Sequence, residues 1–393
     1  MIKKCVLVGV TGGIAAYKAL DVISKLRKAE VEVRVIMTKS ATEFVTQLSF
    51  QSMSQNMVIT DMFLEPKAWE IQHISLAQRA DLVLIVPATA NIIGKVANGI
   101  ADDMLSTTIM ATKAQVVFAP AMNTNMYENR IVQDNIKKLT QYGYKFIEPA
   151  SGRLACGDIG KGKLADTDDI VEDVLSRLYE NKDLQGQNII VTAGPTKAEI
   201  DPVRFITNKS TGKMGYEIAK EARDRGANVT LISGTDALKR PCNVEFVKIN
   251  TNEEMYNEVI KRFDDANIVI KAAAVADYKP KEYSKKKIKK QEGDWSLALE
   301  RDRDILKTLG SKKNKQILVG FAAESNDLIE NAVKKLKNKN LDYIVANDIS
   351  STVTGFGSDE NKVTIISENE KIDLSQMSKR DVAKNIFDII NRR

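Results

Sequence analysis

Three features of the sequence predict an α/β fold, with two Rossmann-like or flavodoxin-like domains built on mainly parallel sheets. Short apolar runs alternate with helical patterns, which is typical of parallel sheets covered by helices on both faces. A strand–glycine turn–helix opening at 5–15 is repeated at 189–215. The length of 393 residues suits two domains of roughly 190 residues better than one. We place the domains at 1–185 and 186–393, with the polar stretch 179–188 as the linker.

The first half is expected to form a sheet with a ligand site at one edge. Its strands are predicted at 4–8, 32–37, 82–86, 115–119 and 144–147, and its helices near 15–28, 41–48, 92–97, 104–111 and 129–142. Ligands of such sheets lie at the carboxyl ends of the strands. Glycine and polar residues follow the first four strands, at 9–13, 38–40, 87–91 and 120–127. The pattern therefore predicts a ligand site at that edge.

The loop after the first strand is suited to an anion. Gly9, Thr11, Gly12 and Gly13 let the backbone approach a ligand at the start of a helix. The spacing is not that of a dinucleotide-binding GxGxxG, and no acidic residue ends the second strand. The hydroxyl residues Thr38 and Ser40 follow that strand instead and suit a phosphate, so a mononucleotide is favoured over NAD. A plain tight turn is the alternative.

Two residues of the first half are candidates for proton transfer. His73 is the only histidine in the chain and lies at a helical start, where a structural role is the alternative. Cys156 lies in the glycine-rich segment 150–162, which cannot form a stable helix and is predicted to be a mobile flap. A cysteine on a flap is better placed for chemistry than for core packing, although it is also compatible with a small apolar side chain in a loop.

The second half repeats the α/β pattern. Strands are expected at 188–192, 228–232, 268–272, 316–320 and 341–346, a hairpin at 362–366 and 371–374, and helices at 214–225, 253–264, 305–309, 327–337 and 381–391. Ser210, Thr211 and Gly212 lie at a helix start, which again suits an anion. Asn208 precedes them and is also a common turn residue. A nucleotide site is expected after the strand at 268–272.

Composition limits the partners and the compartment. The net charge is +6, and its excess is densest at 279–290, where seven lysines occur. This run is either a solvated loop or a lid that closes over a polyphosphate. Because arginine is absent from the run, nucleic-acid binding is not expected. Three widely separated cysteines favour a reducing cytoplasm over a disulfide framework, and no apolar run has the roughly 20 residues needed to span a membrane.

The first half resembles the flavin-dependent cysteine decarboxylases, specifically phosphopantothenoylcysteine decarboxylase. The resemblance covers nearly all of 1–180 and rests on GVTGGIAAYK, His73, PATANIIGKVANGIADD, PAMNTNMY and GRLACG. Tyr127 departs from the tryptophan that the family often has. The resemblance implies that FMN oxidises a cysteinyl thiol toward a thioaldehyde, which allows loss of CO2. It implies a trimer, in which His73 acts on a site shared with a neighbouring subunit.

The resemblance also assigns roles to residues. His73 would be the base of the oxidative half-reaction, Asn123 would hold the departing carboxylate, and Cys156 would donate a proton during reduction. Met126 would contact the substrate. The flavin would be bound by the loops after three strands, through Gly9, Thr11, Gly12, Gly13, Thr38, Ser40, Pro87, Ala88, Thr89, Ala90 and Asn91.

The second half resembles phosphopantothenate–cysteine ligase. The motifs are TAGPT, TNKSTGKMG, AAAVADY, KIKK, GFAAES and NLDYIVAND, and they cover most of 188–370. The match implies that the carboxylate of 4'-phosphopantothenate attacks CTP to give an acyl-cytidylate, from which cysteine displaces CMP. Asn208 would stabilise charge on the acyl oxygen, Lys287 would contact the triphosphate, and Mg²⁺ is expected with CTP. The other binding residues would be Ser210, Thr211, Gly212, Lys271, Ala272, Ala273, Asp277, Lys289, Asp302, Arg303, Asp304, Ile305, Phe321, Lys335 and Lys339.

The second half differs from the usual ligase sequence at two places. Thr211 stands where serine is common, which keeps the hydroxyl group, and Asp302–Ile305 reads DRDI where Asn-Pro-Asp-Ile is common. Together the resemblances imply a bifunctional coenzyme A biosynthetic enzyme, with dimeric ligase domains joining trimeric decarboxylase domains into a closed oligomer. The alternatives are a non-catalytic regulatory flavoprotein and a decarboxylase fused to an NAD(P) reductase.

Overall fold

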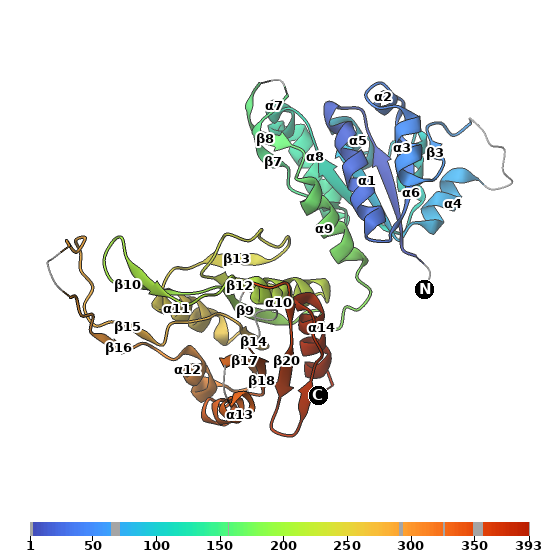
Figure 1. Cartoon of the computed structure of the whole chain (residues 1–393). Coiled ribbons are helices and arrows are strands. Elements are labelled where there is room, and N and C mark those ends of the chain that lie inside the picture. The colour runs from blue at the N-terminus through green and yellow to red at the C-terminus, as the bar shows by residue number, and fades with distance from the viewer. Residues whose placement is uncertain are drawn as a thin grey trace. The chain divides into compact units, whose positions relative to one another are not determined.

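The computed structural model divides into two compact units, Met1–Leu178 and Tyr179–Arg393 (Figure 1). It describes residues 3–63, 71–155, 157–290, 294–324, 327–348 and 357–392. Each unit has its own parallel sheet and its own cores on the two faces of that sheet. The predicted α/β class with mainly parallel sheets is confirmed.

The sheet of the first unit has six parallel strands in the order β3-β2-β1-β4-β5-β6. The strands are β1 (Cys5–Val10), β2 (Glu32–Met37), β3 (Val58–Ile59), β4 (Leu82–Ala88), β5 (Gln115–Pro120) and β6 (Lys145–Phe146). The order reverses between β1 and β4, because β1 pairs with both β2 and β4. Loops after these two strands diverge at that point, which is where ligands bind in open parallel sheets.

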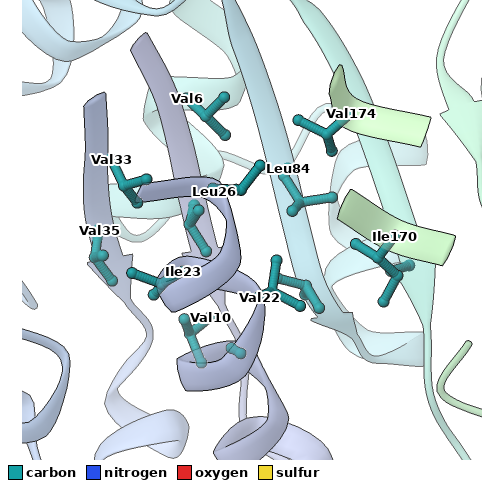
Figure 2. Close-up of a cluster of buried hydrophobic side chains, with 14 of the residues drawn as sticks. Val6, Val10, Val22, Ile23, Leu26, Val33, Val35, Leu84, Ile170 and Val174 are labelled. Carbon is teal, nitrogen blue, oxygen red and sulfur yellow. The ribbon is translucent and has the colours of Figure 1, made fainter. Parts of the chain in front are cut away.

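Helices cover both faces of this sheet. The helices are η1 (Ile14–Tyr17), α1 (Lys18–Lys28), α2 (Lys39–Thr42), α3 (Gln47–Ser54), α4 (Gln72–Arg79), α5 (Ala90–Ala97), α6 (Met104–Ala111), α7 (Thr124–Glu128), α8 (Arg130–Gln141) and α9 (Thr167–Leu178). Figure 2 shows side chains of α1 and α9 turned toward those of β1, β2 and β4 on one face. Helices α4, α5, α6 and α8 pack on the other face.

The second unit has an eight-stranded sheet in the order β13-β12-β9-β14-β17-β18-β20-β21. Its parallel strands are β9 (Asn188–Ala193), β12 (Asn228–Ser233), β13 (Glu245–Lys248), β14 (Ile268–Lys271), β17 (Ile317–Glu324) and β18 (Tyr343–Asp348). The strands β20 (Val363–Ile366) and β21 (Lys371–Asp373) are antiparallel, as the predicted hairpin requires. The order reverses between β9 and β14, so a second ligand site is expected there.

Two groups of helices cover this second sheet. Helices α10 (Lys213–Asp224) and α14 (Lys379–Ile390) pack on one face. Helices α11 (Asn252–Phe263), α12 (Ile305–Lys312) and α13 (Leu328–Asn338) pack on the other. Short antiparallel ribbons complete the unit: β10 (Lys197–Glu199) with β11 (Phe205–Thr207), β15 (Tyr278–Pro280) with β16 (Leu299–Arg301), and β19 (Glu360–Asn361) with β22 (Met377–Ser378).

Three of the differences between the structure and the predicted elements concern helices and the linker. The helix expected at 41–48 is instead the short α2 followed by α3, which begins at the N-cap Thr46. Helix α9 was not predicted, although Ile170 and Val174 are buried against the first sheet. The expected linker at 179–188 packs on the second unit, since Leu184 is buried and the Tyr179 hydroxyl donates to Glu221 at 2.8 Å.

Candidate functional sites

Two loops meet at the carboxyl edge of the first sheet, between β1 and β4. The hydroxyl of Thr11, after β1, donates to the carbonyl oxygen of Pro87 on β4 at 2.6 Å. The backbone N–H of Thr89 donates to the Thr11 hydroxyl at 3.3 Å. Thr11 is buried, and its two hydrogen bonds link the predicted loops 9–13 and 87–91. The side chain of Thr89 then caps α5 by accepting from the N–H of Ile92.

The loop after β2 completes this edge. A Cβ atom on Gly12 would collide with Cβ of Ser40, so glycine permits the close approach of these two backbones. The hydroxyl oxygen of Thr38 is buried, and within the described residues it has no hydrogen-bond partner. Leaving a buried hydroxyl unpaired costs about 1–3 kcal/mol. A phosphate oxygen at this position would satisfy it, so the loops fit the phosphate of a mononucleotide.

Gly9 was predicted in the ligand loop but lies inside β1. A Cβ atom at this position would lie 2.5 Å from Cδ1 of Leu105 on α6 and 2.8 Å from Cδ1 of Ile85 on β4. The lack of a side chain at Gly9 is therefore required by packing beneath α6. The part of the loop that is available to a ligand begins at Thr11.

The glycine-rich segment forms an antiparallel hairpin, β7 (Ala150–Arg153) with β8 (Ile159–Lys163), beside α7. The backbone N–H of Met122 donates to the carbonyl oxygen of Gly162 at 2.9 Å. Nδ2 of Asn123 donates to Oδ2 of Asp158 at 2.7 Å. The hairpin and the PAMN loop therefore form one site. Cys156 lies outside the described residues.

His73 lies in the first turn of α4 and is partly buried. Because α4 leads into the amino end of β4, its first turn is directed toward the carboxyl edge of the sheet. Among the described residues, His73 makes no hydrogen bond or ion pair that would join it to Asn123 or the flavin loops. Met126 is about half exposed on α7. The structure of one chain places the PAMN loop beside the loop after β4, since the N–H of Ala121 donates to the carbonyl oxygen of Ala88 at 3.0 Å.

A cavity of about 390 Å³ lies at the carboxyl edge of the second sheet. Its walls come from the start of α10, the loop after β14, the start of α12, β17 and α13. Most of the predicted ligase residues line it: Asn208, Ser210, Thr211, Gly212, Lys271, Ala272, Ala273, Asp277, Arg303, Asp304, Ile305, Phe321, Lys335 and Lys339. The predicted residues thus converge on one cavity from five separate parts of the sequence.

Three lysines give one wall of the cavity a positive charge. Nζ of Lys335 donates to the carbonyl oxygen of Phe321 at 2.8 Å, and Nζ of Lys339 lies 2.7 Å from Oδ2 of Asp304. Lys271 ends β14 between them. Burial, together with the ammonium groups of Lys335 and Lys339, lowers the pKa of Lys271 to about 7. This wall therefore carries an excess of positive charge that suits a polyphosphate.

Asn208 holds the loop after β14 in place. Its Nδ2 donates to the carbonyl oxygens of Ala274 at 3.2 Å and Val275 at 3.0 Å. Gly212 follows with a φ of 82°, in the left-handed region, and begins α10. The residues predicted to bind an anion thus stand at the N-terminal end of a helix of 12 residues, where backbone N–H groups favour negative charge.

Three predicted residues do not line the cavity. Lys287 and Lys289 are exposed, and Oδ1 of Asp302 lies 3.8 Å from Nζ of Lys279. The lysine-rich segment is held against the β10–β11 ribbon, since the N–H of Ser284 donates to Ile200 at 3.0 Å. The N–H of Ile288 donates to the carboxylate of Asp201 at 3.1 Å. In this structure the segment therefore lies on the ribbon rather than over the cavity.

Several lining residues were not predicted. They are Lys209, Lys213, Met214, Gly215, Ala274, Val275, Leu306, Ala322, Asn347, Gly357, Asn361 and Lys379. Lys213 lies within the TNKSTGKMG motif, so its position in the first turn of α10 was a usable signal. Lys379 lies far along the chain from the other motifs and carried no signal of its own.

No cluster of three or more acidic, cysteine or histidine side chains suited to a metal ion occurs within the described ranges. Of the helices that the structure describes, none combines the length and apolar character needed to cross a bilayer.

Two protein families match the chain, one for each unit. The family described as Flavoprotein matches residues 1–179. The family of DNA/pantothenate metabolism flavoprotein C-terminal domains matches residues 184–393, which is more than half of the chain. The first unit is thus a flavoprotein domain by sequence, in agreement with loops that fit a mononucleotide phosphate.

Full-length relatives carry both halves. The coenzyme A biosynthesis bifunctional protein CoaBC of Bacillus subtilis (strain 168) is 51% identical over 97% of this chain and 95% of its own length. The protein of the same name from Borreliella burgdorferi is 44% identical over 98% of this chain and 99% of its own. A crystal structure of the C-terminal domain of a CoaBC protein is 44% identical and covers 54% of this chain and 96% of its own, with a TM-score of 0.47. The full-length matches show that this chain belongs to the family of coenzyme A biosynthesis bifunctional proteins.

Proposed function

We propose that the chain catalyses two consecutive steps of coenzyme A biosynthesis. The second unit ligates cysteine to 4'-phosphopantothenate with CTP, and the first unit decarboxylates the 4'-phospho-N-pantothenoylcysteine so formed to 4'-phosphopantetheine with FMN. Relatives named for bifunctional coenzyme A biosynthesis support this proposal. The observation that carries it is the cavity of the second unit, where Lys271, Lys335 and Lys339 gather positive charge beside a helix start.

The ligase reaction has two displacements. The carboxylate of 4'-phosphopantothenate attacks the α-phosphorus of CTP, an O–P bond forms, and pyrophosphate leaves. The amine of cysteine then attacks the acyl carbon, CMP leaves, and the nitrogen loses a proton to solvent. Positive charge from the lysines neutralises the triphosphate while the anionic carboxylate approaches it. Asn208 stabilises the acyl oxygen, which requires its Nδ2 to leave the carbonyl oxygens of Ala274 and Val275. Mg²⁺, when bound with CTP, would neutralise part of the charge of the phosphate chain.

The remaining predicted contacts surround the nucleotide. Asp277 accepts hydrogen bonds from ribose or the cytosine amino group, and Phe321 contacts the base. Lys287 and Lys289 reach the triphosphate from the lysine-rich segment, which requires that segment to leave the β10–β11 ribbon. The sequence DRDI at 302–305, where Asn-Pro-Asp-Ile is common, affects the contacts to cytidine.

The decarboxylase reaction uses the first unit. The phosphate of FMN is held by Thr38, Ser40 and the loop from Thr11 to Gly13, while 87–91 contact the ring. FMN, when bound, supplies reversible redox chemistry: electrons pass to it when the cysteinyl thiol is oxidised and return to the product after CO2 is lost. His73 takes the proton of the oxidative step, and Asn123 holds the departing carboxylate. Cys156 returns a proton when the product is reduced.

Assembly and compartment form part of the proposal. We expect trimeric first units linked through dimeric second units, in the cytoplasm, with His73 contributed to a neighbour's flavin site. Large apolar side chains are exposed on the first unit, among them Ile14 in η1 and Leu48 in α3. Exposed apolar side chains on a soluble unit are compatible with burial in an interface.

The test is an assay on the full chain with 4'-phosphopantothenate and cysteine, in which pyrophosphate and CO2 are measured with CTP or ATP. We expect both products with CTP and a yellow protein that retains FMN. Asn208→Asp should lower CO2 release from 4'-phosphopantothenate and cysteine by about 100-fold or more, because an oxyanion donor is lost from the amide-forming step. It should spare CO2 release from added 4'-phospho-N-pantothenoylcysteine. Asn314→Asp, at an exposed position in the same unit, is the control. Flavin-free protein, or ligation unaffected by Asn208→Asp, would contradict the respective half.

A further inference from the structure

Lys213 and Lys379 form a second cationic group in the ligase cavity. Lys213 begins α10 and Lys379 begins α14, and these helices cover the same face of the sheet. Lys271, Lys335 and Lys339 are grouped with α12 and α13 toward the other face. All five lysines line the same cavity. The carboxyl edge of the sheet therefore carries one group of ammonium ions on each side.

The two ammonium groups of the α10–α14 side hold consecutive residues of one loop. Nζ of Lys213 donates to the carbonyl oxygen of Gly357 at 2.8 Å and lies 2.7 Å from Oδ1 of Asp359. Nζ of Lys379 donates to the carbonyl oxygen of Ser358. The two side chains therefore reach the same short stretch, so one ligand group can contact both.

Lys379 is a buried ammonium without a paired carboxylate. Its relative exposure is 6%, yet no carboxylate in the described ranges lies within ion-pair distance of its Nζ. Burial and the charge of Lys213 lower the pKa of Lys379, and the nearby carboxylate of Asp359 opposes them only in part. A buried charge normally has a counter-charge, because an unpaired one is costly. Asp359 is already paired with Lys213, so two ammonium groups share one carboxylate, which favours an anionic ligand group at this end of the cavity.

A second unpaired atom lines the same cavity. Oδ1 of Asn347, near the end of β18, is buried and has no hydrogen-bond partner among the described residues. It can accept a hydrogen bond from a hydroxyl or amide N–H of a ligand. The cavity thus offers a cation pair together with an acceptor, which a ligand with an anionic end and a polar chain would satisfy.

We infer that Lys213 and Lys379 bind the terminal phosphate monoester of the acyl substrate, while the opposite lysines bind the nucleotide triphosphate. This assignment rests on the proposed ligase function, which needs a nucleotide and a phosphorylated carboxylic acid in one cavity. Each of these substrates has its own phosphate, and the cavity has two cationic groups on opposite sides of the sheet. The hydroxyl and amide groups along the acyl chain would then satisfy Asn347.

The test compares 4'-phosphopantothenate with unphosphorylated pantothenate as acyl substrates of the full chain, with pyrophosphate release as the measurement. Lys379→Gln should lower kcat/KM for 4'-phosphopantothenate at least tenfold more than kcat/KM for pantothenate, as expected for one charge-assisted hydrogen bond. Lys213→Gln should act in the same direction. Lys384→Gln, at an exposed position of α14, is the matched control and should leave the preference for the phosphate unchanged.

Three results would overturn the inference. A purely structural role of Lys379 would lower kcat/KM for both acyl substrates by the same factor. A role in triphosphate or cysteine binding would raise the KM of CTP or cysteine and leave the preference between acyl substrates intact. If Lys379→Gln does not fold, an unchanged preference in Lys213→Gln would refute the subsite. Absence of pyrophosphate release by the unaltered chain would instead contradict the proposed function, and the subsite with it.

Discussion

Lys271 is the residue whose ionisation is most directly linked to ligand binding in the ligase cavity. With a pKa of about 7, it is largely a neutral amine in the free protein above neutral pH. A bound triphosphate favours the charged form, so nucleotide binding above pH 7 must be accompanied by proton uptake. Below pH 7 the ammonium is already present, and binding takes up no proton at this site.

The expected outcome is that the contribution of Lys271 to CTP affinity is complete below pH 7 and declines as pH rises. The decline should be at most about tenfold per pH unit, because one proton is taken up. The ratio of the CTP dissociation constants of Lys271→Met and the unaltered chain, measured by calorimetry at pH 6 and pH 9, isolates this effect from titration of CTP itself. A ratio that does not change with pH would refute the linkage.

Thr38 offers a test in which affinity and stability change in opposite directions. Thr38→Val keeps the shape of the side chain and removes a buried hydroxyl that has no partner in the described part of the chain. FMN affinity should fall about tenfold through loss of one hydrogen bond to phosphate. The flavin-free protein should be as stable as before or more stable, because an unpaired polar atom is removed.

Flavin fluorescence titration and thermal unfolding of the flavin-free protein measure the two effects. Thr42→Val is the control, since the Thr42 hydroxyl is exposed and donates to the carbonyl oxygen of Lys39. Unchanged FMN affinity, or a flavin-free protein markedly destabilised by Thr38→Val, would show that this hydroxyl serves the fold rather than the cofactor.

At the scale of single residues, sequence reasoning identified candidate residues that lie in or beside short motifs. Thr38 was predicted as a phosphate ligand because a hydroxyl residue follows a strand at the ligand edge, and its buried hydroxyl has no partner in the described part of the chain. Lys335 and Lys339 came from a family resemblance, and both line the cavity. Lys379 could not be found in this way, because nothing in the sequence indicates that the start of the last helix packs beside the start of α10. Only the tertiary fold brings these two helix ends together.

The β7–β8 hairpin is the element whose contacts bear most on decarboxylation. Asn123, the proposed holder of the substrate carboxylate, donates to the carboxylate of Asp158 on the loop between the two strands. Asp158 therefore occupies a position on Asn123 that a substrate carboxylate would need. Because the amide nitrogen has two hydrogens and one of them is used here, a substrate carboxylate that needs both must compete with Asp158.

Asp158→Ala should therefore lower the KM for 4'-phospho-N-pantothenoylcysteine, by about threefold if the displaced contact is worth roughly 0.6 kcal/mol. The measurement is CO2 release by the full chain as a function of substrate concentration. Asp134→Ala, at an exposed position on α8, is the control. A raised KM would show that Asp158 assists binding, and a lowered kcat with unchanged KM would show that it positions the hairpin.

At the scale of elements, the strands were predicted more reliably than the connections. The run Glu32–Met37 was predicted with its observed bounds, because Val33 and Val35 alternate with charged neighbours before an apolar end, which is typical of a strand. Helix α9 was missed because acidic residues in its first turn mask the apolar positions Ile170 and Val174. The 41–48 helix was wrong because Thr46 caps a new helix, so the chain turns where the apolar pattern continues.

Across the whole molecule, the boundary between the units depends on a buried ionic network of the second unit. Arg225 is fully buried and donates to Glu221 at 2.7 Å, to Asp183 at 3.2 Å and to Asp388. The Tyr179 hydroxyl also donates to Glu221, and burial together with that carboxylate raises the pKa of Tyr179 to about 12. Polarity alone predicted a linker at 179–188, whereas the fold uses these polar groups as partners of a buried guanidinium.

This packing predicts where the second unit can be cut from the first. A fragment that begins at residue 179 keeps Tyr179, Asp183 and the buried side chain of Leu184, whereas one that begins at 186 loses all three. Exposing Leu184 costs about 1.5–3 kcal/mol. Loss of the partly exposed Asp183 adds about 1 kcal/mol or less, because Arg225 keeps Glu221 and Asp388 as partners. We therefore expect the shorter fragment to be less stable by about 2–3 kcal/mol, as measured by urea unfolding of both fragments. Equal unfolding midpoints would show that 179–185 contributes nothing to the second unit and is only a tether. Asp183→Asn in the longer fragment separates the ionic part of the effect, because it weakens the contact to Arg225 while Leu184 and Tyr179 stay in place.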